Sequence, residues 1–88
     1  MHLIEFSKEA SKVLARMPRD LRDLRDLLMR KIEVVAADPY GAHGDVKRLQ
    51  GRPEFRLRVH DWRVVYRVLD DRVALLVIKI GVRGQVYE

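Results

Sequence analysis

The feature that most constrains the fold is a run of alternating residues over positions 54–67, interrupted by a tight turn. Apolar and charged side chains alternate with period 2 on both sides of His60-Asp61, which is the pattern of two strands joined by a two-residue loop. Such a loop places Arg58 directly opposite Arg63. One hairpin face then carries Phe55, Leu57, Val59, Trp62, Val64 and Tyr66, and the other carries Arg56, Arg58, Arg63 and Arg67 together with Glu54 and Val65. The apolar face, Trp62 included, is expected to pack on the core.

The cations of the second face lie close together. Arginines directly opposite each other on neighbouring strands repel and destabilise a hairpin. The whole chain has a net charge of +5, and residues 47–67 alone hold seven basic side chains against two acidic ones. A concentrated positive patch favours nucleic acid or an acidic protein segment as the partner. The alternative is a solvated strand face without a partner.

The segment before the hairpin predicts a strand followed by two helices. Residues 2–6 form a short strand candidate, and the hydroxyl of Ser7 is expected to cap the first helix. Pro18 ends that helix and can open the second, which is expected over residues 19–37 and stops before Pro39. The apolar stripes are Ala10, Val13, Leu14 and Met17 in the first helix, and Leu21, Leu24, Leu28, Ile32 and Val35 in the second.

The remaining segments predict strands. Residues 47–49 form a short strand candidate, and residues 72–80 form a strand whose apolar run fits a sheet interior. The order of elements predicts one α+β domain over residues 1–88, with two N-terminal helices packed on one face of a small, mostly antiparallel sheet. The Arg-Asp-Leu repeat at residues 19–27 is expected to form a salt-bridged solvent face.

Composition excludes several kinds of site. The chain has no cysteine, so it can form neither a disulfide nor a thiolate metal site, which suits the cytoplasm. No apolar run approaches the roughly 18 residues that a membrane span needs, and the N-terminus is not a signal peptide. His2, His43 and His60 lack metal-ligand spacing, and Ser7 and Ser11 both belong to the first helix. We therefore expect no metal, no cofactor, no membrane association and no serine nucleophile.

Cations and a tyrosine remain as candidates for chemistry. They are Arg56, Arg58 and Arg63 on the hairpin, with Arg83 and Tyr87 near the C-terminus. Positive charges alone can promote reactions of a phosphodiester, because they stabilise the negative charge that builds on its oxygens. The planar fork of arginine binds phosphate through two hydrogen bonds, and a tyrosine ring can stack on an RNA base. Further RNA contacts are expected from Lys47, Arg48, Arg52, Arg67 and His60, although a histidine at a turn can also be merely exposed.

Several segments resemble the RelE/ParE toxin superfamily. The run Phe-Arg-Leu-Arg-Val-His-Asp-Trp-Arg-Val-Val-Tyr at 55–66 resembles its strand–turn–strand signature. Residues 6–18 resemble its opening strand and helix, residues 38–41 and 47–51 its connecting segment, and residues 80–87 its closing segment. The resemblance covers nearly the whole chain and implies a RelE-like fold.

For RelE-type members the resemblance implies a ribosome-dependent endoribonuclease that cuts mRNA in the A site, where the 2′-hydroxyl attacks the adjacent phosphate. Arg56 and Arg58 fall at the basic pair of such enzymes, Arg63 at the phosphate-stabilising arginine, Arg83 at the leaving-group arginine and Tyr87 at the base-stacking tyrosine. Partners implied are the ribosome, mRNA and an acidic RelB-like antitoxin. ParE-type members share the fold but poison DNA gyrase by binding, and this is the alternative function. A plain nucleic-acid-binding module or an inactivated toxin is a third.

The chain departs from the family pattern at two places. Arg56 and Arg58 stay protonated and are poor general bases, so they would act through their charge on the 2′-hydroxyl or support only slow turnover. His60 replaces the glycine usual at the turn, and a residue with a side chain is strained at positive φ.

Overall fold

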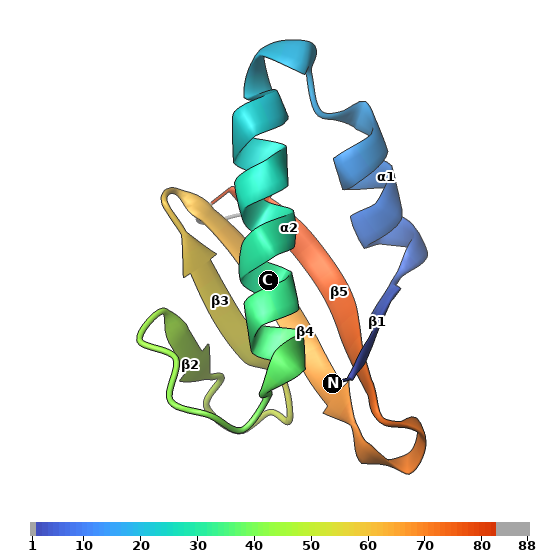
Figure 1. Cartoon of the computed structure of the whole chain (residues 1–88), viewed down its shortest axis with the longest axis vertical. Helices are drawn as coiled ribbons and strands as arrows, with labels where there is room; N and C mark the ends of the chain where they lie inside the picture. Colours follow the sequence, from blue (N-terminus) through green and yellow to red (C-terminus); the bar gives the residue numbers. More distant parts are fainter. Residues whose placement is uncertain (1, 83–88) are drawn as a thin grey trace.

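The predicted hairpin forms part of a five-stranded sheet in the computed structural model of the protein, which describes residues 2–82 (Figure 1). The elements are β1 (Leu3–Phe6), α1 (Lys8–Arg16), a 3₁₀ turn (Arg19–Leu21), α2 (Arg22–Ala37), β2 (Val46–Arg48), β3 (Phe55–Val59), β4 (Trp62–Leu69), a second 3₁₀ turn (Asp70–Arg72) and β5 (Ala74–Val82). The strands lie in the order β1-β5-β4-β3-β2, with β1 parallel to β5 and the other neighbours antiparallel. The predicted fold class is confirmed.

Both helices cover the same face of the sheet, as Figure 1 shows. Ser7 caps α1 as predicted, because its hydroxyl oxygen accepts the N–H of Ala10 at 3.0 Å. The same hydroxyl donates to the carbonyl of Ile78, and the backbone N–H of Ser7 donates to the carbonyl of Val77 at 2.8 Å. The start of α1 is therefore tied to β5.

The core lies between the helices and the sheet. Its buried members are Ala10, Leu14, Leu28, Ile32, Val35 and Ala36 from the helices, and Leu57, Val59, Val64, Tyr66, Leu75, Val77 and Ile80 from the strands. The predicted stripes are confirmed, except that Met17 is the C-cap that follows α1 and Leu21 falls in the 3₁₀ turn before α2. Trp62 is partly buried and packs against this core, and Phe55 stacks on Tyr66 with ring centroids 5.5 Å apart.

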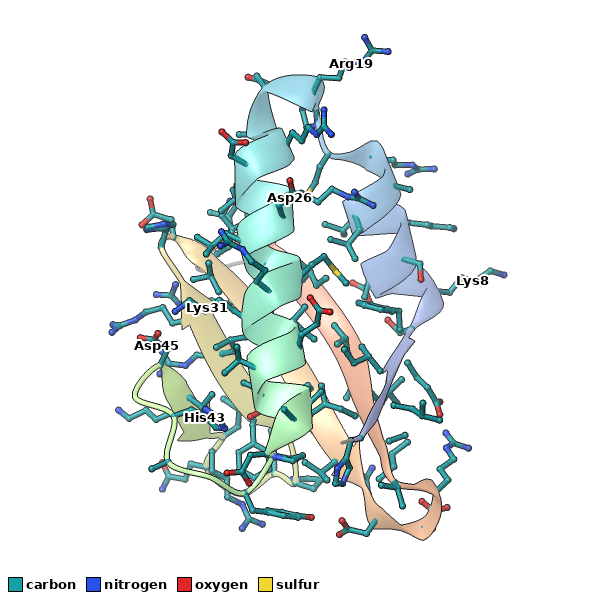
Figure 2. The ribbon with its side chains drawn as sticks, viewed as in Figure 1. Lys8, Arg19, Asp26, Lys31, His43 and Asp45 are labelled. Atoms are coloured by element: carbon teal, nitrogen blue, oxygen red, sulfur yellow. The ribbon has the colours of Figure 1, made fainter. Side chains whose placement is uncertain are left out.

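The charged repeat on the helices does not form the predicted ion pairs. The ion pairs within residues 2–82 are Lys31–Asp45, Arg52–Glu54 and Arg72–Glu5, so none involves residues 19–27. Figure 2 shows Lys31 extending from α2 toward Asp45, which lies just before β2. Neither α1 nor α2 has the length and apolar character needed to cross a membrane.

A bulge interrupts the register between β4 and β5. Tyr66 pairs with Val77, whereas the preceding residue, Val65, pairs with Lys79, so that Ile78 has no opposite residue. Side chains alternate between the two faces of a sheet, and one extra residue inverts that alternation for the rest of the strand. The bulge therefore decides which face each residue of the second half of β5 occupies.

Candidate functional site

The hairpin places its arginines on the sheet face that the helices leave uncovered. β3 and β4 pair in the predicted register, with Arg58 opposite Arg63 and Leu57 opposite Val64. Leu57 and Val64 are buried beneath the helices, so the neighbouring arginines project to the other side. The turn needs a φ of 53° at His60, which is the left-handed conformation expected where the family usually has glycine.

A groove of about 430 Å³, which we call the arginine groove, opens on this face. Its lining residues are Lys47, Arg48, Leu49, Gln50, Arg56, Arg58 and Arg63. Every charged residue among them is basic, and none takes part in an ion pair with the described residues 2–82. Lys47 lies directly opposite Arg56, just as Arg58 lies opposite Arg63. Like charges in directly opposed positions destabilise a sheet, and an anion bound in the groove would relieve that repulsion.

Arg63 is the cation held most firmly in the groove. Its side chain is only 7% exposed, and its Nη1 donates to the carbonyl oxygens of His60 at 2.9 Å and Trp62 at 3.0 Å. These two bonds fix the guanidinium against the hairpin turn, but the carbonyls are neutral and no carboxylate of residues 2–82 pairs with it. A cation withdrawn from water is costly unless an anion pairs with it. The setting of Arg63 therefore favours a negatively charged ligand.

The predicted RNA contacts Arg48, Arg52 and Arg67 are spread over the surface. Arg48 lines the groove and also lies over the ring of Phe55, 6.0 Å from its centroid. Arg52 donates through Nε to Glu54 at 2.8 Å and is absent from the groove lining. Arg67 is exposed on the uncovered face of β4, outside the groove lining.

His60 is absent from the lining of this groove. His60 lines a different hollow at the end of the hairpin, together with Leu27, Lys31 and Asp45. Arg83 and Tyr87, which are predicted at the leaving group and at a stacked base, lie outside the described residues. Their predicted roles therefore remain expectations from the resemblance.

Sequence reasoning did not single out Lys79, which shares the uncovered face. Lys79 lies opposite Val65, and Val65 lies opposite Arg56 on its other side. A lone cation within an apolar strand was a signal in the sequence, but its face depends on the bulge, which the alternation pattern does not reveal.

The groove residues act as fixed positive charges. Arginine stays protonated in proteins, so Arg56, Arg58 and Arg63 can bind a phosphodiester and stabilise added negative charge but cannot accept a proton. No cluster of histidine and carboxylate side chains suited to a metal ion occurs within the described part of the chain. A second groove, of about 420 Å³, lies between α1 and Trp62. Its lining is largely apolar and includes both acidic and basic side chains, so it lacks the uniformly basic charge of the first groove; the residues besides Trp62 are Glu9, Lys12, Val13, Arg16, Met17 and Pro18.

Known proteins share both the sequence pattern and the fold. A family model described as the ParE toxin of type II toxin–antitoxin system, parDE, matches residues 4–87. No curated protein matches at a significant level.

Solved structures of several toxins superpose on the chain. The isolated E. coli RelE toxin has a TM-score of 0.80 and 22% identity, over 99% of this chain and 89% of that one. RelE in the intact E. coli RelBE toxin–antitoxin complex gives 0.78 and 23%, over 97% and 100%. The YoeB/ParE toxin from Agrobacterium tumefaciens gives 0.79 and 18%, over 92% and 98%. The family match together with this shared fold shows that the chain belongs to the ParE toxin family of type II toxin–antitoxin systems, within the RelE/ParE toxin superfamily.

Proposed function

We propose that the protein is a RelE-type toxin, a ribosome-dependent endoribonuclease that cleaves mRNA in the A site. The observation that carries this proposal is the groove in which the nearly buried Arg63 lies with Arg56, Arg58 and Lys47, without a carboxylate partner among the described residues. Such a surface suits a phosphodiester backbone. It also suits a reaction whose transition state carries more negative charge than its substrate.

The proposed reaction is attack of the RNA 2′-hydroxyl on the adjacent phosphate, which forms a 2′,3′-cyclic phosphate and breaks the bond to the 5′-oxygen. Water takes up the proton of the 2′-hydroxyl and supplies a proton to the departing 5′-oxygen. Arg63 would hold the phosphate, because its position is fixed by two backbone carbonyls. Arg56 and Arg58 would favour ionisation of the 2′-hydroxyl through their charge, since neither can take up its proton. By the family resemblance, Arg83 would stabilise the leaving oxygen and Tyr87 would stack on a base.

The proposed protein partner is an acidic RelB-like antitoxin. RelE occurs with its antitoxin in the E. coli complex, and the groove here carries only basic charged side chains. An acidic segment would be attracted to the same surface that binds RNA. Inhibition would then follow from occupation of the groove.

Inhibition of DNA gyrase is the second candidate function, and the ParE description of the matching family model favours it. A gyrase inhibitor acts by binding alone. It needs no group that stabilises the charge developing on a cleaved phosphodiester.

Cleavage by purified protein distinguishes the two functions. Toeprinting on ribosomes programmed with mRNA should show cuts in the A-site codon, and Arg63→Ala should slow them by about 10²–10³-fold, the typical loss for one well-placed donor. Arg30→Ala removes an exposed arginine of α2 and should leave the rate unchanged. If the wild type cuts no mRNA but inhibits gyrase supercoiling, the nuclease proposal is wrong and the gyrase proposal replaces it.

A further inference from the structure

The bulge in β5 gives the uncovered face a cation that an uninterrupted strand would hide. Continuing the register from the Tyr66–Val77 pair without a bulge would place residue 79 opposite Val64, in the core beneath the helices. The extra residue, Ile78, turns Lys79 outward instead. It also turns Ile80 toward the core beneath the helices, where only 5% of that residue is exposed.

The bulge is held in place by the start of α1. The Ser7 hydroxyl donates to the carbonyl of Ile78, and the backbone N–H of Ser7 donates to Val77 at 2.8 Å. Bulges next to functional sites commonly re-aim a side chain. Here the re-aimed side chain is Lys79.

Lys79 completes a row of residues that crosses four strands. Lys47 in β2 pairs with Arg56 in β3, Arg56 with Val65 in β4, and Val65 with Lys79 in β5. Directly opposed residues project from the same face, so all four share the face of the arginines. Neighbouring strands lie about 4.8 Å apart, and the row therefore spans about 14 Å between the outer lysines at the level of the backbone.

The row has cations on both sides of the apolar residue Val65. Val65 is 1% exposed, and the partly exposed Lys79 lies beyond it, outside the lining of the arginine groove. No ion pair within residues 2–82 involves Lys79. Among these residues its ammonium has no carboxylate partner, and it lies on the same face as the groove, on β5, the strand next to Val65 in β4.

We propose that Lys79 binds a backbone phosphate of single-stranded RNA at a position flanking the phosphate held in the arginine groove. The inference rests on the proposed function in taking RNA as the anion, and it extends the site from the hairpin onto β5. A single strand lying along the row passes from Lys47 and Arg56 across Val65 to Lys79. Lys79 contributes charge to binding along this path and leaves the chemical step to the groove.

The salt dependence of RNA binding tests this contact. Affinity for a single strand falls as salt rises, and each phosphate contact steepens the plot of log affinity against log salt by about 0.7. The size of this negative slope is called the slope below. Lys79→Gln should therefore lower the slope for a labelled, unstructured oligouridylate by about 0.7. The advantage of the wild type over Lys79→Gln should accordingly shrink by roughly 2.6-fold as salt rises from about 50 to 200 mM.

Three further variants test the contact against net charge, packing and the path of the RNA strand. Lys8→Gln removes the same charge from the first residue of α1, where Figure 2 shows Lys8 pointing away from the sheet, and its slope should equal that of the wild type. Lys79→Arg keeps the charge and should keep the slope. Lys47→Gln combined with Lys79→Gln should lower the slope by about 1.4, because one strand contacts both lysines.

The outcomes separate this inference from the proposed function. If the wild type binds RNA and cuts mRNA but Lys79→Gln keeps the wild-type slope, the Lys79 contact is wrong and the nuclease proposal stands. Equal losses of slope in Lys79→Gln and Lys8→Gln also overturn it, because net charge would then explain the effect. A wild type that binds no oligouridylate overturns the Lys79 contact, whereas the toeprinting experiment alone decides the nuclease proposal.

Discussion

The buried hydroxyl of Tyr66 affects the stability of the folded protein at high pH. Its ring is buried and stacks on Phe55, but its hydroxyl has no hydrogen-bond partner within the described residues. Burial raises the pKa of Tyr66 to about 12, because the phenolate is poorly solvated there. The exposed Tyr40 differs, since its hydroxyl donates to both carboxylate oxygens of Asp70, at 2.8 and 2.7 Å, and this hydrogen bond raises its pKa.

Replacing Tyr66 by phenylalanine should therefore flatten the alkaline loss of stability. Above pH 10 the unfolded tyrosine loses its proton while folded Tyr66 keeps it, so the free energy of unfolding falls as pH rises toward 12. A shift of about two pKa units corresponds to roughly 3 kcal/mol. Urea unfolding of Tyr66→Phe between pH 7 and 12 should show a smaller decline than that of the wild type, and at pH 7 the variant should be at least as stable as the wild type.

Tyr40→Phe is the matched control. It removes a hydroxyl that is hydrogen-bonded, so it should lower stability at pH 7, in contrast to Tyr66→Phe. A Tyr66→Phe variant that follows the wild-type alkaline curve would show that Tyr66 is not the group responsible.

At the scale of elements, the hairpin was predictable because two local signals agree. Alternation with period 2 fixes the faces of residues 55–59 and 62–66, and a two-residue turn fixes the register between them. The cap of α1 was equally local, since Ser7 bonds to a backbone group three residues away. The bulge in β5 was not predictable from alternation, because it depends on a contact between Ser7 and Ile78 that joins distant parts of the chain.

Two turns in the sheet hold residues with side chains in the left-handed conformation. His60 joins β3 to β4 with a φ of 53°, and Val73 precedes β5 with a φ of 50°. Histidine tolerates this region better than a β-branched residue does. The strain at Val73 should therefore exceed the strain at His60.

Glycine at these turns should stabilise the protein, and more so at Val73. His60→Gly should be more stable than His60→Ala by about 1 kcal/mol, because alanine keeps the steric conflict of the left-handed region. Val73→Gly should exceed Val73→Ala by a larger margin, as measured by denaturant midpoints. Both His60 variants should retain ribosome-dependent cleavage if His60 serves the turn alone, whereas equal loss of cleavage in both would assign its ring to RNA binding.

At the scale of the whole molecule, the helices cover one face of the sheet, and the basic side chains of the hairpin project from the other face. The sequence could place Arg56, Arg58 and Arg63 on that face because a single hairpin carries all three. It could not tell that Arg52 is paired with Glu54, since proximity in a turn is compatible with several side-chain directions. It also gave no sign that Lys79 joins the face, because four strands must assemble before that row exists.

The position of charge, more than its total, should control the encounter with an acidic antitoxin. Lys47→Glu and Lys8→Glu change the net charge of +5 by the same amount, but Lys47 lines the groove whereas Lys8 starts α1. If the field of the uncovered face steers association, Lys47→Glu should slow binding of an acidic RelB-like antitoxin and weaken the salt dependence of that binding. Lys8→Glu should do neither. Stopped-flow association rates at low and high salt measure both effects, and equal slowing by the two variants would show that only the net charge matters.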